Sequence, residues 1–307
     1  MLRSRPFGLT YGPECPTICE VRQLDGPIHP RPRVVIFDLD GVIYRGDVPV
    51  PGAVELVRRL HAEEIEVRFA TNNSLVTRAD YVRVLAGMGI RSSDDEIVTS
   101  NTATVLHLER HAPEVRSVVG VGEQGLLSEL RATGLVVMPA ADLAAEARSG
   151  GRLARRYDAV VAGLDRRFDY GRLAAAAAAI RAGARYFATN ADARYPTPAG
   201  FLPGAGSMVS AIATASGVDP EVIGKPAPAM LTAIVEAAGV KPEEALMVGD
   251  NPDADIVAAR RAGIPSILVL TGVADAVTAD ALDGDRRPDA VVDDPEGVAS
   301  LLGLVSS

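Results

Sequence analysis

The sequence of 307 residues contains only two cysteines, Cys15 and Cys19, and both lie in a proline-rich stretch near the N-terminus. A structural zinc site needs four ligands, and no second cysteine pair is present to complete one. The spacing would allow half of a metal site or a labile disulfide, but an ordinary flexible leader over residues 1–32 explains it more simply. We therefore expect no fold built on zinc or disulfides.

Long apolar runs and an excess of basic residues are also missing. No stretch approaches the roughly 18 to 20 apolar residues that a membrane-spanning helix needs. The N-terminus, with Arg3 and Arg5 followed by prolines, lacks the apolar core of a signal peptide. The formal net charge of −9 argues against a surface for nucleic acid or anionic lipid. These features predict a cytoplasmic protein that binds neither nucleic acid nor membranes, and they leave a homodimer open.

Short apolar runs alternate with longer amphipathic segments from Arg33 onward, which is typical of an α/β fold with a parallel sheet. We expect a Rossmann-like core from residues 33–101 and 220–307, with a second α/β domain inserted at residues 102–219. The expected core strands are Val34–Phe37, Val67–Ala70, Ala245–Val248 and Ser266–Leu270. The expected core helices are Val54–Glu64, Arg78–Met88, Pro228–Ala238 and Asp253–Ala262. In the inserted segment we expect strands Ser117–Val121, Ala159–Ala162 and Tyr186–Ala188 and helices Glu123–Ala132 and Tyr170–Arg181.

Two carboxylates follow directly after the first core strand, in the segment Asp38-Leu39-Asp40-Gly41. Ligands of parallel α/β sheets bind beyond the carboxyl ends of the strands, so Asp38 and Asp40 stand where chemistry would take place. A simpler interpretation fits the same residues, with one aspartate capping a turn and the other in solvent. The ends of the other strands favour the chemical interpretation.

Polar side chains also follow two further core strands. One strand ends at Thr71-Asn72-Asn73-Ser74, whose hydroxyl, amide and backbone N–H groups suit the oxygens of a phosphate. The strand Ala245–Val248 ends at an acidic loop that contains Asp250 and Asp255. Anionic and phosphate-binding groups are thus expected at the same edge of the sheet.

Lysine is rare, since only Lys225 and Lys241 occur and every other basic side chain is arginine. A compact ammonium group brings a point charge into a small site, where a planar guanidinium would need more room. Lys225 lies between Gly224 and Pro226, ahead of a predicted helix. Alone, Gly-Lys-Pro would most often be an ordinary loop.

Taken together, these segments resemble the motifs of the haloacid dehalogenase superfamily in their usual order: Asp38-Leu39-Asp40-Gly41, Thr71-Asn72-Asn73, Gly224-Lys225-Pro226, and Gly249-Asp250 with Asp255. Flanking segments are similar to the subfamily that carries a large α/β cap between the second and third motifs: Tyr44-Arg45-Gly46, Pro49-Val50-Pro51-Gly52-Ala53, Pro203-Gly204-Ala205-Gly206-Ser207 and Leu270-Thr271-Gly272-Val273. That subfamily includes 4-nitrophenylphosphatase, phosphoglycolate phosphatase, pyridoxal phosphate phosphatase and NagD-like proteins. The resemblance extends from about Arg33 to the C-terminus.

The resemblance implies a Mg²⁺-dependent phosphatase of small phosphate monoesters, with activity on 4-nitrophenyl phosphate. Asp38 would attack phosphorus and form an aspartyl-phosphate, and Asp40 would act as the acid and base. Asp38 and Asp250 would supply carboxylates to the metal, and Asp40 its backbone carbonyl. Magnesium fits, because clustered carboxylates repel one another unless a divalent cation neutralises them.

The resemblance also assigns the groups around the phosphate. Thr71, Asn72, Asn73 and Lys225 would hold and neutralise the transferring phosphoryl group. Asp255 would orient Lys225 or a metal-bound water. The acid role of Asp40 favours phosphoester hydrolysis over dehalogenation, because a dehalogenase has no alkoxide to protonate.

Specificity is expected in the inserted domain, which would close over the core and expel water. The candidate segment is a loop at residues 190–196. There, Arg194 would pair with a substrate carboxylate such as that of phosphoglycolate, and Tyr195 would stack on a ring such as pyridoxal; both would equally fit a position in solvent. Glycerol phosphate and a nucleotide monophosphate are further candidate substrates.

Two alternatives come from other classes of protein. Gly120, Gly122 and Gly125 match G-x-G-x-x-G between a predicted strand and helix, and Asp142 follows about 20 residues on, as in dinucleotide-dependent oxidoreductases. A tight turn inside the inserted domain explains the glycines more simply, because the motif opens no full-sized dinucleotide domain. The second alternative is a binding or regulatory protein that keeps the fold without catalysis.

Overall fold

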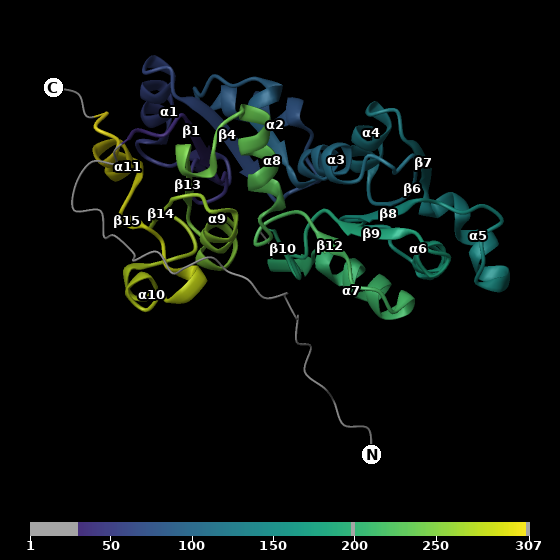
Figure 1. Ribbon diagram of the computed structural model, residues 1–307. Coiled ribbons are helices and arrows are strands. Elements are labelled where there is room, and N and C mark those ends of the chain that lie inside the picture. The colour runs from purple at the N-terminus through teal and green to yellow at the C-terminus, as the bar shows by residue number, and fades with distance from the viewer. Residues whose placement is uncertain (1–29, 198–199, 305–307) are drawn as a thin grey trace.

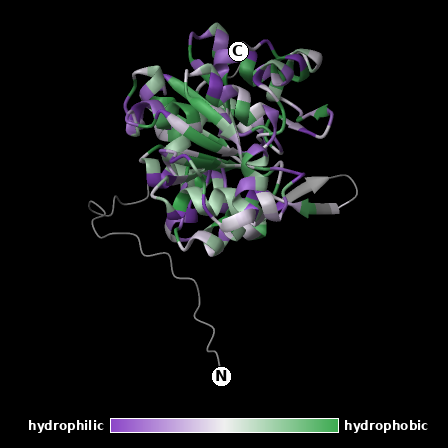
Figure 2. Cartoon of the chain, turned by 90° about the vertical axis from the view of Figure 1, so that its right-hand side faces the viewer, coloured by the Kyte–Doolittle hydropathy of each residue, from purple (hydrophilic) through white to green (hydrophobic). Residues whose placement is uncertain are grey.

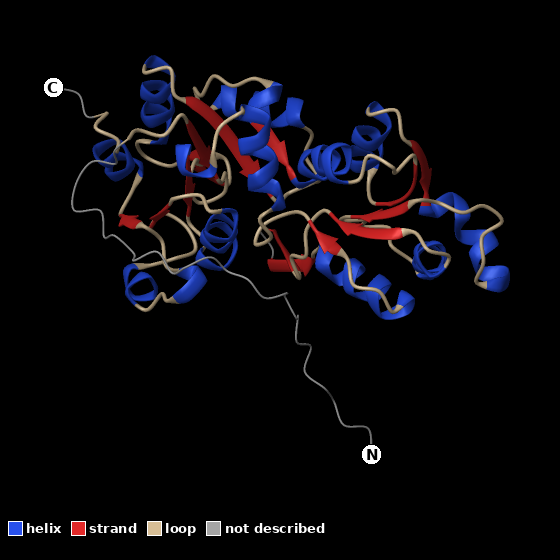
Figure 3. Ribbon diagram, viewed as in Figure 1, coloured by secondary structure: helices blue, strands red, loops and turns tan. Residues whose placement is uncertain are grey.

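The computed structural model describes residues 30–197 and 200–304. Cys15 and Cys19 lie outside these residues, so the expectation for the leader stays a prediction. Two parallel sheets form the body of the molecule, and Figure 1 shows them side by side, with α3 (Ser100–His111) between them. Helices cover the strands of both sheets (Figure 3). The predicted α/β class with a parallel Rossmann-like core is confirmed.

The first sheet has six strands in the order β15-β14-β13-β1-β4-β5, and every neighbouring pair is parallel. Its strands are β1 (Val34–Phe37), β4 (Glu66–Thr71), β5 (Ile97–Thr99), β13 (Ala245–Gly249), β14 (Ser266–Val269) and β15 (Ala290–Val292). Its helices are α1 (Ala53–Ala62), α2 (Arg78–Gly87), α8 (Ala229–Ala238), α9 (Val257–Ala262), α10 (Ala276–Asp280) and α11 (Pro295–Leu301). A short hairpin, β2 (Tyr44–Arg45) with β3 (Val48–Pro49), follows β1.

Apolar residues of β1 face both sides of this sheet, which explains why the strand is an unbroken apolar run. Val35 and Phe37 join one hydrophobic cluster with residues of α1, α2 and α11. Val34 and Ile36 join a second cluster with residues of α3 and α8. The strands therefore form the apolar interior between layers of helices, as the hydropathy colouring in Figure 2 shows.

The second sheet has five parallel strands in the order β12-β9-β8-β6-β7. Its strands are β6 (Ser117–Val121), β7 (Val136–Pro139), β8 (Ala159–Ala162), β9 (Arg185–Ala188) and β12 (Glu221–Val222). Its helices are α4 (Gln124–Ala132), α5 (Ala140–Gly150), α6 (Tyr170–Arg181) and α7 (Ala205–Ser216). We propose that this sheet is the core of an inserted domain near residues 102–219, with α3 crossing the start of that range and contacting both α8 and α4.

Three expected elements differ from the structure. The helix expected from Asp253 is a π-helical turn (Pro252–Ile256) that continues as α9. The helix expected to reach Glu64 ends at Ala62, and Glu64 has a positive φ of 56°. No described helix is both long and apolar enough to cross a membrane.

The loop expected at residues 190–196 is the third difference. Its second half forms β10 (Arg194–Thr197), which pairs with β11 (Gly200–Pro203) in an antiparallel hairpin. Pro196 is unusual within a strand, because proline cannot donate an N–H to a ladder. A two-stranded ribbon tolerates it, since each strand has an outer edge where no N–H is needed.

Candidate functional site

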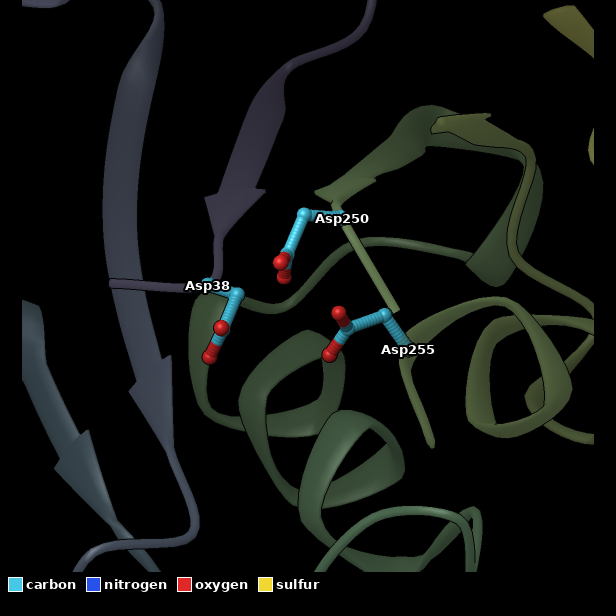
Figure 4. Close-up of side chains that lie close together, drawn as sticks. All are labelled: Asp38, Asp250 and Asp255. Atoms are coloured by element: carbon cyan, nitrogen blue, oxygen red, sulfur yellow. The ribbon is translucent and has the colours of Figure 1, made fainter. Parts of the chain in front are cut away.

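Three carboxylates converge at the carboxyl edge of the six-stranded sheet. Asp38 follows β1, Asp250 follows β13, and Asp255 lies on the π-helical turn after β13. One carboxylate oxygen from each lies within 4.8 Å of the others. Figure 4 shows the three side chains pointing toward one another from these separate segments. Because parallel strands end at one edge, residues more than 200 positions apart in the chain meet here.

Lys225 is the cation of this cluster. Its Nζ lies 2.6 Å from Asp38 Oδ1 and 2.7 Å from Asp255 Oδ1, and it donates to the carbonyl of Ala70 at 2.9 Å. The side chain is 3% exposed. The buried ammonium thus donates hydrogen bonds to Asp38 and Ala70 and forms an ion pair with Asp255, which compensates its charge inside the protein.

Burial and mutual repulsion shift the pKa values of the cluster. Burial lowers the pKa of Lys225, but Asp255 and Asp38 raise it more, so its net pKa lies above its usual range. Burial raises the pKa of Asp38 against the opposing effect of Lys225. Burial, together with the charge of Asp255, raises the pKa of Asp250 from 3.8 to about 6. Such perturbed carboxylates are typical of functional sites.

The charge balance fits a divalent cation. One ammonium group for three clustered carboxylates leaves two negative charges at the edge of the sheet. Lys225 contacts Asp255 and Oδ1 of Asp38, whereas the carboxylate of Asp250 accepts from the backbone N–H of Val273, at 2.7 Å. The carboxylates of Asp38 and Asp250 offer hard oxygen donors of the kind that Mg²⁺ prefers.

Glycines leave room for the buried carboxylates. A Cβ on Gly272 would lie 1.8 Å from Asp250 Oδ2, and one on Gly41 would lie 2.4 Å from it. A Cβ on Gly249 would lie 2.3 Å from Asp255 Cβ. Gly41 also has a φ of 84°, which favours glycine. Any side chain at these positions would displace a carboxylate.

The loop after β4 forms another side of the site. Thr71 is buried, and its Oγ1 accepts from the N–H of Asn73 at 3.1 Å. Asn73 Oδ1 accepts from the N–H of Leu75 at 3.0 Å, so side-chain hydrogen bonds within the loop hold its backbone in place. The side-chain amide of Asn72 donates to the carbonyl of Lys225 and to Asp192, so the phosphate role expected at this position would fall to its backbone N–H, and that role stays a prediction.

A cavity of about 820 Å³ joins these groups to the second sheet. Asp40 lines it, and loss of water around the crowded carboxylate raises the pKa of Asp40 against the charge of Lys225. Leu164 follows β8, Asp192 lies between β9 and β10, and Arg194 lies on β10; all three line the same cavity. The side chain of Tyr195 lies outside the part that the structure describes, so its stacking role stays a prediction.

Several contributors to the site were not assigned a role from the sequence. Thr271 Oγ1 donates to the carbonyl of Gly41 at 2.6 Å, and Val273 holds Asp250. Asn190 and Asp192 contact Asn72 from the second sheet. The segments Leu270–Val273 and Pro203–Ser207, which resemble the subfamily with a large cap, were the sequence signal for these contributors. Their contribution to the site follows only from contacts between segments that are distant in the chain.

The glycines of the dinucleotide-type motif have a packing role. A Cβ on Gly120 would lie 2.4 Å from Leu127 Cδ2, and one on Gly122 would lie 2.7 Å from Leu126 Cδ2, so both glycines allow α4 to pack against β6. Asp142 lies in the first turn of α5, the helix that directly follows β7. The motif is therefore explained by packing within the second sheet.

Comparison with known proteins agrees with this geometry. Residues 35–136 match the family model of haloacid dehalogenase-like hydrolases, and residues 222–296 match that of HAD-hydrolase-like proteins. The D-glycerol 3-phosphate phosphatase of Mycobacterium tuberculosis is 39% identical over 83% of this chain and 67% of its own length. The 5'-nucleotidase YutF of Bacillus subtilis is 35% identical over 78% of this chain and 87% of its own. The chain belongs to the haloacid dehalogenase-like hydrolases.

Solved structures place the hydrolase within the predicted subfamily. NagD from Escherichia coli aligns with a TM-score of 0.75 and 30% identity, over 86% of this chain and 97% of its own. Glycerol phosphate phosphatase Rv1692 from M. tuberculosis, in complex with magnesium, aligns with a TM-score of 0.74 and 36% identity, over 87% and 76% of the two chains. The resemblance predicted from the motifs is confirmed.

Proposed function

We propose that the protein is a Mg²⁺-dependent phosphatase that hydrolyses small phosphate monoesters through an aspartyl-phosphate on Asp38. The observation that carries the proposal is the buried cluster of Asp38, Asp250, Asp255 and Lys225 beside a loop rich in phosphate-binding groups. Its charge balance and its place at the carboxyl edge of a parallel sheet match a site for a metal and a phosphate.

The contacts around Asp38 suggest how it is prepared for attack. Lys225 holds Oδ1 at 2.6 Å, which leaves the other oxygen to approach phosphorus in line with the leaving group. The N–H groups of the loop at residues 71–74 and the hydroxyl of Thr71 receive the phosphoryl oxygens. Asp38 and Asp250 would hold Mg²⁺, whose positive charge would offset the negative charge of the phosphate.

Asp40 supplies the proton. Its raised pKa favours a protonated carboxyl that can donate to the leaving oxygen as the bond from oxygen to phosphorus breaks. The resulting carboxylate then takes a proton from water as the water attacks the aspartyl-phosphate. Phosphate leaves, Asp38 regains its carboxylate and Asp40 its proton, so both are restored after each turnover.

The proposed substrates follow from the relatives. Glycerol phosphate is the first candidate because the D-glycerol 3-phosphate phosphatase is 39% identical. A nucleoside monophosphate is the second, because a 5'-nucleotidase is 35% identical. Phosphoglycolate and pyridoxal phosphate stay as alternatives through Arg194 and Tyr195.

Metal-dependent turnover tests the proposed function. Purified protein is expected to release phosphate from 4-nitrophenyl phosphate and glycerol 3-phosphate with Mg²⁺, and to lose this activity in EDTA because the carboxylates then lack their counter-ion. Excess Mg²⁺ should restore activity. Turnover at the same rate in EDTA would contradict the metal's role, and no turnover of any phosphate ester would favour the regulatory alternative.

The raised pKa of Asp250 predicts a pH-dependent response to Mg²⁺. The folded protein binds this proton more tightly than the unfolded chain, so the metal-free protein is expected to lose stability as pH rises from about 4 through about 6. Mg²⁺ needs the deprotonated carboxylate, so its affinity should fall about tenfold per pH unit below about 6. Thermal unfolding with and without Mg²⁺ should show a larger shift in Tm at neutral pH than at about pH 5. If the Mg²⁺-induced shift in Tm keeps the same pH dependence in Asp250→Asn, the assignment of Asp250 as the titrating metal ligand is contradicted.

A further inference from the structure

A contact between the two sheets joins Asn72 to Asp192. Asn72 follows β4 of the six-stranded sheet, and Asp192 lies between β9 and β10, 120 residues later. The side-chain nitrogen of Asn72 donates to both carboxylate oxygens of Asp192, at 3.2 and 3.1 Å, and to the carbonyl of Lys225 at 2.7 Å. Both of its N–H groups are therefore used within the protein.

The backbone of Asn72 is held from the same side. Its carbonyl accepts from Asn190 Nδ2 at 2.9 Å and from Ser100 Oγ at 2.9 Å. Asn190 lies two residues before Asp192, and Ser100 begins α3, the first connection to the second sheet. Residues outside the six-stranded sheet thus contact both the side chain and the backbone of a residue in the phosphate-binding loop.

Asp192 is itself fixed by the start of α7. Its carbonyl accepts from the N–H of Gly206 at 2.9 Å, and its own N–H donates to Asn190 Oδ1 at 3.2 Å. A Cβ on Gly204 would lie 2.1 Å from the carbonyl oxygen of Asp192, and one on Gly206 would lie 2.3 Å from that of Ala191. These two glycines let α7 approach the loop closely. The carboxylate is therefore presented from a tightly packed backbone.

We propose that Asp192 is a positioning residue, which acts through Asn72 to orient the loop at residues 71–74 for the phosphoryl group. This inference rests on the proposed phosphatase activity. The contact is a hydrogen bond to a charged acceptor at a half-buried position, and bonds with an ionised partner are stronger than bonds between neutral groups. Since the oriented loop receives the phosphoryl group, the effect is independent of the leaving group. The second sheet then contributes to turnover of every substrate, in addition to selecting among them.

A double-mutant cycle tests this inference. Asp192→Ala is expected to lower kcat/KM by roughly 10- to 100-fold, the range for loss of a charge-assisted hydrogen bond. The factor should be the same for 4-nitrophenyl phosphate and glycerol 3-phosphate, and inhibition by inorganic phosphate should weaken as well. Combined with Asn72→Ala, the loss should be no greater than for Asn72→Ala alone, because one residue acts through the other. Asp192→Asn keeps an acceptor oxygen and should restore part of the activity.

Asp253→Ala is the matched control, because it removes one negative charge from the wall of the same cavity without contacting Asn72. Multiplying effects in the double mutant, or a loss confined to one substrate, would overturn the inference in favour of a direct substrate contact. If Asp192→Ala fails to fold, activity of Asp192→Asn equal to wild type overturns it. Two measurements separate the two proposals. A wild-type protein without phosphatase activity refutes the proposed function. Equal affinity of wild type and Asp192→Asn for inorganic phosphate, measured by calorimetry, refutes the positioning role.

Discussion

Asp38→Asn is expected to lower kcat by about 10⁴- to 10⁶-fold, the range for removal of a nucleophile in covalent catalysis. The amide has nearly the shape of the carboxylate but cannot form the acyl-phosphate intermediate. Phosphate release from 4-nitrophenyl phosphate, measured at high enzyme concentration, would quantify the loss. Residual activity above about one hundredth of wild type would contradict the nucleophile assignment.

The same variant is expected to stay folded. Asp38 lies among Asp250 and Asp255, and both raise its pKa, so loss of its charge relieves repulsion in the cluster. Lys225 keeps its partner Asp255. The free energy of unfolding should therefore fall by no more than about 1 kcal/mol. Asp47→Asn, the same change at an exposed residue of the β2–β3 turn, should leave both activity and stability unchanged.

Lys225→Met is expected to destabilise the metal-free protein by about 3 to 5 kcal/mol, because breaking a buried ion pair leaves its partners uncompensated. Asp38 and Asp255 would both lose the ammonium group that now lies 2.6 and 2.7 Å away. Activity should also fall by about 10²- to 10³-fold, since the attacking carboxylate would no longer be held or its charge offset. Denaturant unfolding in EDTA would measure the first effect and steady-state kinetics the second.

Lys241 provides a matched control, because it is the second of the two lysines and is exposed. Lys241→Met should change neither the free energy of unfolding nor kcat by a measurable amount. Equal stability of the two variants would show that the ion pairs of Lys225 do not hold the site together. Added Mg²⁺ should recover part of the lost stability in Lys225→Met by supplying another positive charge.

The α/β class could be predicted from the sequence because its signals are local. The apolar run of β1 marks a strand buried on both faces, and its abrupt end at Asp38 and Asp40 marks the edge where ligands bind. Strands β6 and β8 and helix α6 have the predicted bounds. The rarity of lysine also drew attention to Lys225, which the structure places against Asp38.

Other elements could not be predicted because they depend on partners. The strand at Arg194–Thr197 depends on its pairing with Gly200–Pro203, a partner that the sequence at residues 190–196 does not indicate. The π-helical turn at Pro252–Ile256 carries Asp255 toward Lys225, whereas a regular helix was expected over the same residues. Periodicity reports which face of a segment is apolar, and it does not report how that segment meets another.

By itself, the sequence determined the parallel α/β class and the residue types available at the strand ends, because periodicity and turn chemistry act over a few neighbouring positions. Only the tertiary structure decided which of those ends share a cavity, that the side chain of Asn72 bonds to Asp192, and that Gly41 and Gly272 make room for Asp250. The contacts of Asn72 with Asp192 and of Gly41 with Asp250 join residues more than 100 positions apart, and they depend on strand order and on the approach of the two sheets, which no local pattern specifies.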